Sequence, residues 1–119
     1  MRNSKLGRLY RDGEIVINKG DEGTCLFVIQ EGKVEVFDEK DGSEIKIADL
    51  GAGEFFGEMG LFEKDVRSCT VRAQGKAKIL TIDKKNFYKT IQKDPTLAYR
   101  LLQKMSFRIR ELNKKVVQA

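Results

Sequence analysis

Most of the chain up to residue 83 consists of short segments in which apolar and polar residues alternate, separated by glycine-rich turns. The segments expected as strands are 6–10, 14–20, 25–30, 33–37, 44–50, 68–74 and 78–83; of these, 25–30 is a nearly continuous apolar run, which suits a buried strand. Val34 and Val36, for example, alternate with Lys33 and Glu35, as expected for a strand with one buried face. Many short strands at even spacing predict a mainly β fold, an antiparallel β-roll of the jelly-roll-like barrel kind, over about residues 6–83.

The pattern changes to a helical period at Asp83, a suitable N-cap residue. A second helix is predicted to start at Asp94 and Pro95, because Asp caps helices and Pro suits their first position, and to run to about Val117. Its apolar residues recur at steps of four and three: Leu97, Leu101, Met105, Ile109, Leu112 and Val116. We therefore expect one domain, residues 1–119, with C-terminal helices over about 84–117.

The apolar stripe of the second helix extends too far to be hidden on a small roll. We expect that part of it packs on a second copy of the chain, which would give a homodimer through the C-terminal helix. Ordinary packing of the whole stripe on the roll stays open as the alternative.

Residues 53–73 contain three groups that suit a sugar phosphate. Gly57 lacks a Cβ, so a ligand can approach the backbone closely. If Gly57 and Glu58 open a helical turn, their N–H groups form an anion site. Arg67 lies across a short loop and can donate two hydrogen bonds to the same anion. Glu58 suits a neighbouring hydroxyl, because an ionised carboxylate only accepts hydrogen bonds. A phosphate beside a ribose hydroxyl satisfies all three residues.

The sequence FGEMGLF at positions 56–62, followed by RSCTV at positions 67–71, resembles the phosphate-binding cassette of cyclic-nucleotide-binding domains. The similarity is greatest to the catabolite activator (cyclic-AMP receptor protein) family and covers nearly the whole chain. It implies a cyclic nucleotide as ligand, cyclic AMP favoured over cyclic GMP, and no resident cofactor. The residues implied to surround the sugar and phosphate are Gly57, Glu58, Met59, Arg67 and Ser68, with Cys69 at a position where the family often has Ala.

The part of the chain that would hold the base departs from this family. The base-contacting hydroxyl residues of the family's long helix correspond, without gaps, to Leu112 and Asn113. Leu112 cannot form a hydrogen bond, whereas the Asn113 amide both donates and accepts. The loop between Glu58 and Arg67 is also one residue shorter than in the bacterial relative. The choice between cyclic AMP and cyclic GMP therefore stays open on these residues. The rest of the pocket wall is expected to be apolar: Val36, Ile47 and Leu50.

Composition excludes several other classes of protein. The sequence has no histidine, the commonest general base and metal ligand, and no nucleophile paired with a base, so neither an enzyme nor a metal site is expected. Its two cysteines are isolated, which indicates a reduced, cytoplasmic location. No run of about 18 apolar residues predicts a membrane span. The net charge is +5, but no aromatic pattern or reading helix accompanies it, so direct nucleic-acid binding is not expected.

The expected function is that of a regulatory switch rather than a catalyst. A ligand shifts an equilibrium between two states by its differential affinity for them. The C-terminal helices would pass that shift to an effector domain or partner outside this chain. The chain stops where the bacterial regulators continue into a helix-turn-helix, so an excised sensory domain and a stand-alone protein both fit. The retained alternative is a nucleotide-free dimeric scaffold of the same fold, against which the trio Gly57, Glu58 and Arg67 argues.

Overall fold

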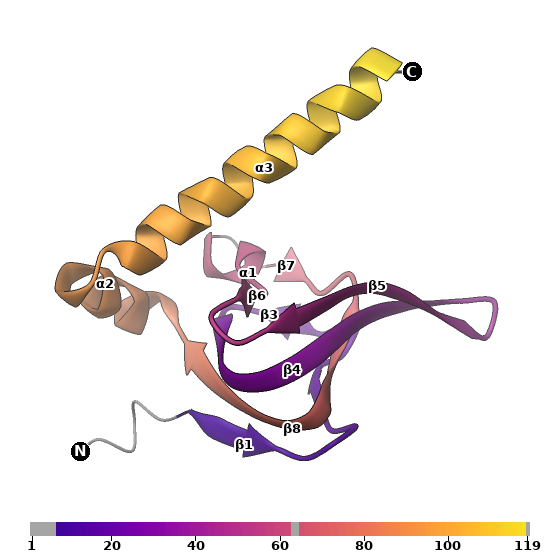
Figure 1. Ribbon diagram of the computed structural model, residues 1–119, viewed down its shortest axis with the longest axis horizontal. Helices are drawn as coiled ribbons and strands as arrows, with labels where there is room; N and C mark the ends of the chain where they lie inside the picture. Colours follow the sequence, from indigo (N-terminus) through magenta and orange to yellow (C-terminus); the bar gives the residue numbers. More distant parts are fainter. Residues whose placement is uncertain (1–6, 63–64, 119) are drawn as a thin grey trace. The chain divides into compact units, whose positions relative to one another are not determined.

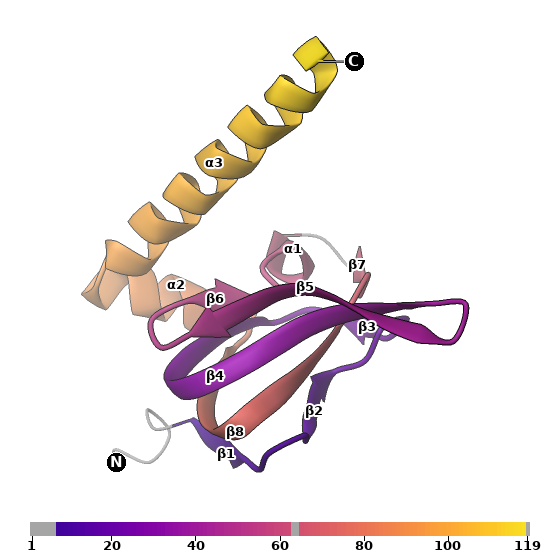
Figure 2. The same cartoon turned by 45° about the vertical axis from the view of Figure 1, so that its right-hand side comes forward.

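Two long antiparallel strands organise the β-rich part of the computed structural model, which describes residues 7–62 and 65–118. Strand β4 spans Leu26–Lys40 and β8 spans Thr70–Ile82. They pair along almost their whole length, and both curve strongly, so that the sheet bends into an antiparallel roll (Figures 1 and 2). The mainly β fold predicted from the sequence is confirmed, and the chain divides into two compact units, residues 1–84 and 85–119.

The shorter strands flank this central pair, and every pairing is antiparallel. The order β1-β8-β4-β5 forms the main path of one sheet, with β2 added to β8 and β6 added to β4, while β3 and β7 form a separate two-stranded sheet. The bounds of these elements are β1 Arg8–Tyr10, β2 Ile15–Ile17, β3 Glu22–Gly23, β5 Ser43–Gly51, β6 Phe55–Phe56, the short helix α1 Met59–Phe62 and β7 Asp65–Val66. Leu6, expected in the first strand, lies outside the described residues.

The turns predicted near Gly32 and Gly75 are wrong, because both glycines lie inside continuous strands. Both have positive φ angles, +88° and +73°. The register jumps here: Glu31 pairs with Lys78, whereas Lys33 pairs with Gln74, which leaves a bulge on β8. Glycines inside strands commonly mark such bulges, which bend a sheet. The two strands expected on each side of each glycine are therefore one bent strand.

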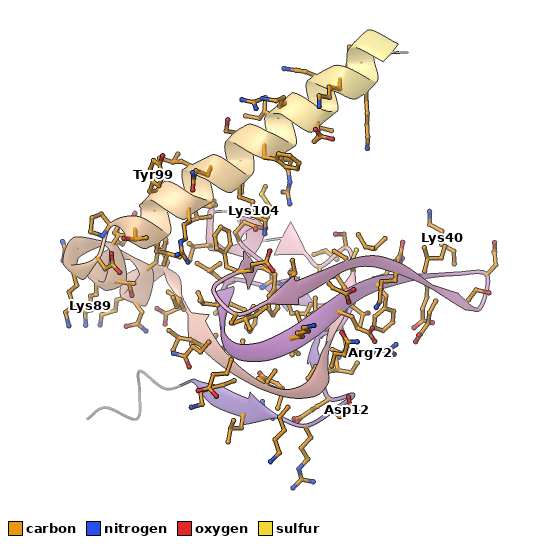
Figure 3. The ribbon with its side chains drawn as sticks, in the orientation of Figure 1. Asp12, Lys40, Arg72, Lys89, Tyr99 and Lys104 are labelled. Carbon is orange, nitrogen blue, oxygen red and sulfur yellow. The ribbon has the colours of Figure 1, made fainter. Side chains whose placement is uncertain are left out.

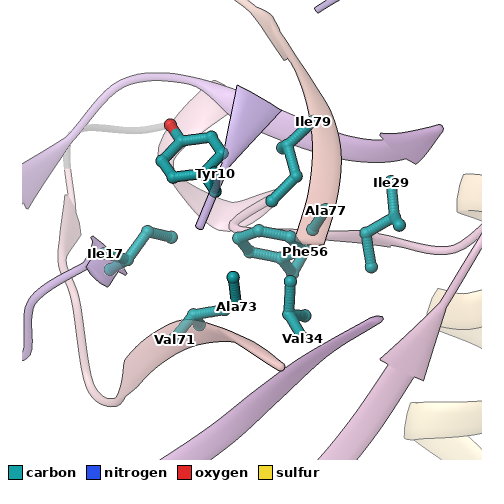
Figure 4. Packing of buried hydrophobic residues seen from close by; sticks show 9 residues of the cluster. All are labelled: Tyr10, Ile17, Ile29, Val34, Phe56, Val71, Ala73, Ala77 and Ile79. Atoms are coloured by element: carbon teal, nitrogen blue, oxygen red, sulfur yellow. The ribbon is translucent and has the colours of Figure 1, made fainter. Parts of the chain in front are cut away.

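The core of the roll consists of alternate residues from these strands. Ile79 and Val34 are fully buried, and the tyrosine ring of Tyr10 closes one side of the cluster (Figure 4). The cluster is Tyr10, Ile17, Ile29, Val34, Phe56, Val71, Ala73, Ala77 and Ile79. Burial of this apolar surface is the main force that holds the strands together. Phe56, at the start of the cassette sequence, belongs to this core and so anchors the segment that follows it.

Strand β5 lies at the edge of the sheet and pairs only with β4 among the described strands. Ile45 and Ile47, which share one face as predicted, are 45% and 57% exposed. Val36 and Leu50 pack partly against the core cluster. Of the three residues expected in an apolar pocket wall, Ile47 is thus the one with an exposed side chain, and the wall itself stays a prediction.

The predicted C-terminal helices are α2 (Lys84–Lys93) and α3 (Thr96–Gln118), which form the second unit apart from Lys84. The Asp94 carboxylate accepts a hydrogen bond from the Thr96 N–H at 3.0 Å, so Asp94 caps α3 as expected. Hydrogen bonding from Thr96 lowers the pKa of Asp94 below its ordinary value. Within residues 7–62 and 65–118, none of the helices combines the length and apolar content that a bilayer-spanning segment requires.

Candidate functional site

Gly57 joins β6 to the single turn of α1 in a conformation that favours glycine. Its φ angle is +75°, and a Cβ there would lie 3.0 Å from Nη1 of Arg67. The turn closes through hydrogen bonds from the Gly60 N–H to the Gly57 carbonyl (3.3 Å) and from the Leu61 N–H to the Glu58 carbonyl (3.0 Å). The glycine-led turn expected at Gly57 and Glu58 is therefore present, and it opens directly towards the arginine expected beside it.

The Arg67 guanidinium lies inside the protein against this turn. Arg67 is only 8% exposed. Its Nη1 donates to the Gly57 carbonyl at 2.9 Å and its Nη2 donates to the Cys25 carbonyl at 2.8 Å. Its Cζ atom lies 5.8 Å from the centre of the Phe27 ring, within cation–π range. Because arginine stays charged at physiological pH, the turn holds a buried positive charge, which suits an anion with several oxygen acceptors.

Three glycines surround the guanidinium, and two of them are not part of the predicted site. A Cβ at Gly23, in β3, would overlap Nε, Cζ and Nη2 of Arg67. A Cβ at Gly60, in α1, would lie 3.0 Å from Nη1. Sequence reasoning also missed Cys25, which contributes only its backbone carbonyl. An absent side chain and a main-chain oxygen leave little signal in a sequence; for Gly23 and Gly60 the glycine identity is the one available hint.

The other predicted sugar-phosphate residues follow the same two segments. Glu58 is buried, 4% exposed, in the turn after Gly57, and Met59 is partly buried at the start of α1. Ser68 is exposed and Cys69 is partly buried directly after Arg67, with the Ser68 hydroxyl 4.0 Å from the Cys69 sulfur. Among the predicted site residues, the structure shows a hydrogen bond between Arg67 and Gly57. The contacts of these residues with a ligand stay predictions.

Leu112 and Asn113, the residues predicted to face the base, lie on α3 in the second unit. Both are exposed, Leu112 to 55%. Their role in holding a base stays a prediction.

A second group of charged residues, on β4, β5 and β8, is paired internally. The two Nη atoms of Arg72 each donate to one carboxylate oxygen of Glu44 at 3.0 Å, and Nε donates to Glu35 (Arg72 is labelled in Figure 3). The guanidinium also lies 4.2 Å from the centre of the Phe37 ring, and Lys46 lies 3.3 Å from Glu35. The hydrogen bond from Arg72 is the main cause of a lowered pKa of Glu35. These side chains tie three strands together, and we assign them a structural role.

The described part of the chain contains no group of three or more His, Cys, Asp or Glu residues placed to hold a metal ion. Cys25 and Cys69 are both free thiols. The structure places one buried guanidinium against the turn at Gly57, with Glu58 in the same turn; the binding of an anion and a hydroxyl by these residues stays a prediction.

A sequence profile of the family described as "Cyclic nucleotide-binding domain" matches residues 7–94. The chain belongs to the cyclic nucleotide-binding domain family. The turn at Gly57 and the buried Arg67 are both inside the matched region, so the resemblance noted for residues 56–62 and 67–71 is confirmed at the level of the family. We refer to residues 56–71 below as the phosphate-binding cassette.

Curated relatives of this family member include regulators from bacteria and fungi. The cAMP-activated global transcriptional regulator Vfr of Pseudomonas aeruginosa is 36% identical over 114 residues, 92% of this chain and 53% of Vfr. The cAMP-dependent protein kinase regulatory subunit of Schizosaccharomyces pombe is 38% identical over 79 residues, 66% of this chain and 18% of that protein. The chain thus spans about half the length of Vfr, and much less of the kinase subunit.

Solved structures agree with this assignment. The catabolite activator protein of Thermus thermophilus matches with a TM-score of 0.78 and 32% identity, over 92% of this chain and 52% of that chain. The EAL enzyme Bd1971 matches at a TM-score of 0.65 and 29% identity in both its cGMP-bound and its cAMP-bound forms. Those matches cover 27% and 28% of the Bd1971 chains, so the cyclic nucleotide-binding domain fold also occurs as a minor part of a larger enzyme.

Proposed function

We propose that this cyclic nucleotide-binding domain is a non-catalytic sensor that binds cyclic AMP in preference to cyclic GMP. Binding would be passed through the C-terminal helices to an effector domain or partner outside this chain. The two free cysteines suit the reduced cytoplasmic location expected from the sequence.

The observation that carries the proposal is the position of the Arg67 guanidinium. It is buried, 8% exposed, beside a turn whose glycine has a φ angle of +75°. In the proposed complex the cyclic phosphate takes hydrogen bonds from Arg67, from backbone N–H groups near Gly57 and Glu58, and from Ser68. The ribose 2′-hydroxyl donates to Glu58, while Met59 and Cys69 border the sugar. Each contact uses a group of the chemistry that the phosphate or hydroxyl requires.

The proposed preference for cyclic AMP rests on sequence similarity to relatives rather than on a contact with the base. Vfr and the kinase regulatory subunit, the two curated relatives described above, are named for cAMP. Bd1971, in contrast, has been solved with either nucleotide. Leu112 and Asn113 are the residues that we propose to test for base selectivity, and only the Asn113 amide of the two can hydrogen-bond to a purine edge.

Transmission of the signal is proposed to involve a homodimer formed through α3. In the second half of this helix, Ile109, Leu112 and Val116 are 59%, 55% and 75% exposed. These side chains recur at the helical spacing that a partner helix would cover, and burying them on a second copy would remove apolar surface from water.

The proposal is tested by titrating the chain with cyclic AMP and cyclic GMP in a calorimeter, with linear 5′-AMP as the control. We expect saturable binding of cyclic AMP, weaker binding of cyclic GMP and little binding of 5′-AMP. Chromatography of the nucleotide after the titration should recover it unchanged, because the proposed role is sensing. Absence of binding by both cyclic nucleotides would favour the nucleotide-free scaffold, and conversion of cyclic AMP into 5′-AMP would favour an enzyme.

A further inference from the structure

The backbone of Gly23 lies directly against the Arg67 guanidinium. A Cβ built on Gly23 falls on Nε, Cζ and Nη2 of the guanidinium, closer than any real contact between these atoms. Gly23 is itself buried, in the two-stranded sheet of β3 and β7. The bare Cα of Gly23 therefore faces the side of the guanidinium that carries Nε and Nη2.

The other side of the guanidinium is also occupied by the protein. Nη1 donates to the Gly57 carbonyl at 2.9 Å and Nη2 donates to the Cys25 carbonyl at 2.8 Å. A guanidinium forms a bidentate pair of hydrogen bonds with a phosphate through Nε and one Nη, or through both Nη atoms. Gly23 lies against the first of these pairs, and the two carbonyls accept from the second. With Arg67 8% exposed, neither pair faces open solvent.

We infer that Gly23 allows Arg67 to rest on the Gly57 and Cys25 carbonyls, so that a nucleotide phosphate must compete with these two carbonyls for the guanidinium. The inference rests on the proposed function, since it concerns how the phosphate gains access to this arginine. Gly23 is thereby a positioning residue that sets the affinity of the site without touching the ligand. The affinity measured for a protein whose competent state is partly populated falls in proportion to that population.

The substitution Gly23→Ala separates an effect of the side chain on Arg67 from a requirement for glycine in the backbone. The φ angle of Gly23 is not in the left-handed region, so alanine is compatible with the backbone. Its methyl group is compatible only with a guanidinium that has moved away. Gly51 is the matched control, because it also lies in a strand without a positive φ angle and a Cβ there would have its nearest neighbour, Glu54 Oε2, at 4.0 Å.

The first test is calorimetry with cyclic AMP on the wild type, Gly23→Ala and Gly51→Ala. The inference predicts that Gly23→Ala binds tighter than the wild type by roughly fivefold or more, because the added methyl group displaces Arg67 from the carbonyls that compete with the phosphate. Gly51→Ala should bind as the wild type does. Unchanged or weaker binding by Gly23→Ala, while the wild type binds, overturns the inference.

The second test does not require a ligand and therefore distinguishes failure of the inference from failure of the proposed function. Gly23→Ala should lower the melting temperature by roughly 4 °C, because the added methyl group displaces the packed guanidinium. In an Arg67→Ala background the same substitution should have little effect, because its methyl group then has room. An equal loss in both backgrounds contradicts the resting contact. If the wild type binds no cyclic nucleotide, the proposed function fails. The melting temperatures of Gly23→Ala in the wild-type and Arg67→Ala backgrounds then decide the inference.

A measurement on the wild type covers the case in which Gly23→Ala does not fold. The Arg67 Nε–H signal, assigned in a nitrogen-15 NMR spectrum by its loss in Arg67→Lys, should exchange slowly with solvent in the ligand-free protein. The exposed Arg8 provides the fast-exchanging reference. Equal exchange rates for the two arginines would overturn the inference.

Discussion

The backbone N–H of Arg67 donates a hydrogen bond to the carbonyl of Asp21 at 2.7 Å, and the Arg67 carbonyl accepts one from the Gly20 N–H at 2.9 Å. The Lys19 N–H adds a bond to the Thr70 hydroxyl at 3.1 Å. The segment between β2 and β3 thus fixes the main chain on both sides of the site arginine. Because the Arg67 main chain is held by these hydrogen bonds, its side chain reaches the turn at Gly57 in a defined position.

The bend at Gly32 predicts an unequal response of two glycines to alanine. A Cβ at Gly75 meets nothing within 4 Å, so Gly75→Ala should cost only the strain of its positive φ angle, about 1–2 kcal/mol. A Cβ at Gly32 would collide with the Lys76 carbonyl, so Gly32→Ala should add a packing cost of about 1–3 kcal/mol. Urea unfolding of both variants measures the difference, and equal losses would contradict the close approach of β4 and β8 at this bend.

The Arg72 cluster predicts a component of acid sensitivity that depends on Glu35. Hydrogen bonding from Arg72 holds the pKa of Glu35 below its ordinary value of 4.5 in the folded state. Its contribution to stability is therefore fully present above that value and is lost as the pH falls through the lower, folded-state pKa. Unfolding free energies measured from about pH 7 down to about pH 3 should show the wild type losing more stability than Glu35→Gln.

The control for this pH dependence is Glu39→Gln, which removes an exposed carboxylate from the same strand. We expect this variant to keep the acid sensitivity of the wild type. A wild type and a Glu35→Gln variant whose stabilities fall in parallel with pH would show that the ion pairs with Arg72 and Lys46 do not contribute.

Much of this fold could be predicted from residue patterns. Apolar patterns identified the longer strands but not the two-residue strands β3, β6 and β7. Asp83 and Asp94 marked the starts of both C-terminal helices. What the pattern could not separate was a turn from a bulge. Gly32 and Gly75 have the same left-handed φ angles in a bulge as in a turn, and only the pairing of distant strands decides between them. Local sequence specifies the conformation of such a glycine but not its partner.

Glu58 is expected to distinguish ribose from deoxyribose. A 2′-deoxy analogue of cyclic AMP should bind the wild type more weakly by about 1.5–3 kcal/mol, the value of a hydrogen bond to a charged group. Glu58→Gln keeps the size of the side chain but removes its charge, so the difference between the two nucleotides should shrink. Calorimetry on both proteins with both nucleotides gives the coupling free energy between the Glu58 carboxylate and the 2′-hydroxyl. The same discrimination by both proteins would remove Glu58 from the ribose site.

The exposed stripe on α3 predicts that a charge at its centre weakens self-association. Ile109→Glu should raise the dissociation constant of a homodimer by about tenfold or more, because burial of one such side chain contributes about 1.5–3 kcal/mol. Gln103→Glu introduces the same charge at an exposed polar position of the helix and should leave association unchanged. Sedimentation analysis measures both. A wild type that stays monomeric at every concentration would contradict the proposed dimer.

The candidate site was predictable where it depends on side-chain chemistry and was missed where it depends on the main chain. Glu58 and Arg67 carry recognisable side-chain groups, Gly57 stands at a recognisable spacing from Arg67, and the structure places Arg67 against the Gly57 carbonyl. Gly23 and Cys25 act through an absent side chain and a carbonyl oxygen, and they reach Arg67 only because β3 pairs with β7. That pairing joins two very short strands whose sequences have no alternation to reveal it.

The binding of cyclic AMP by Arg67→Ala, beside the wild type and Arg8→Ala, tests the central claim most directly. Arg8 is an exposed arginine of β1 that pairs with Glu14, so its loss removes one positive charge without touching the cassette. We predict that Arg67→Ala loses about 3–5 kcal/mol of binding free energy, at least about a hundredfold in affinity, because a phosphate would be left without its buried cation. Arg8→Ala should bind as the wild type does. Equal affinities of Arg67→Ala and the wild type would contradict the assignment of this site.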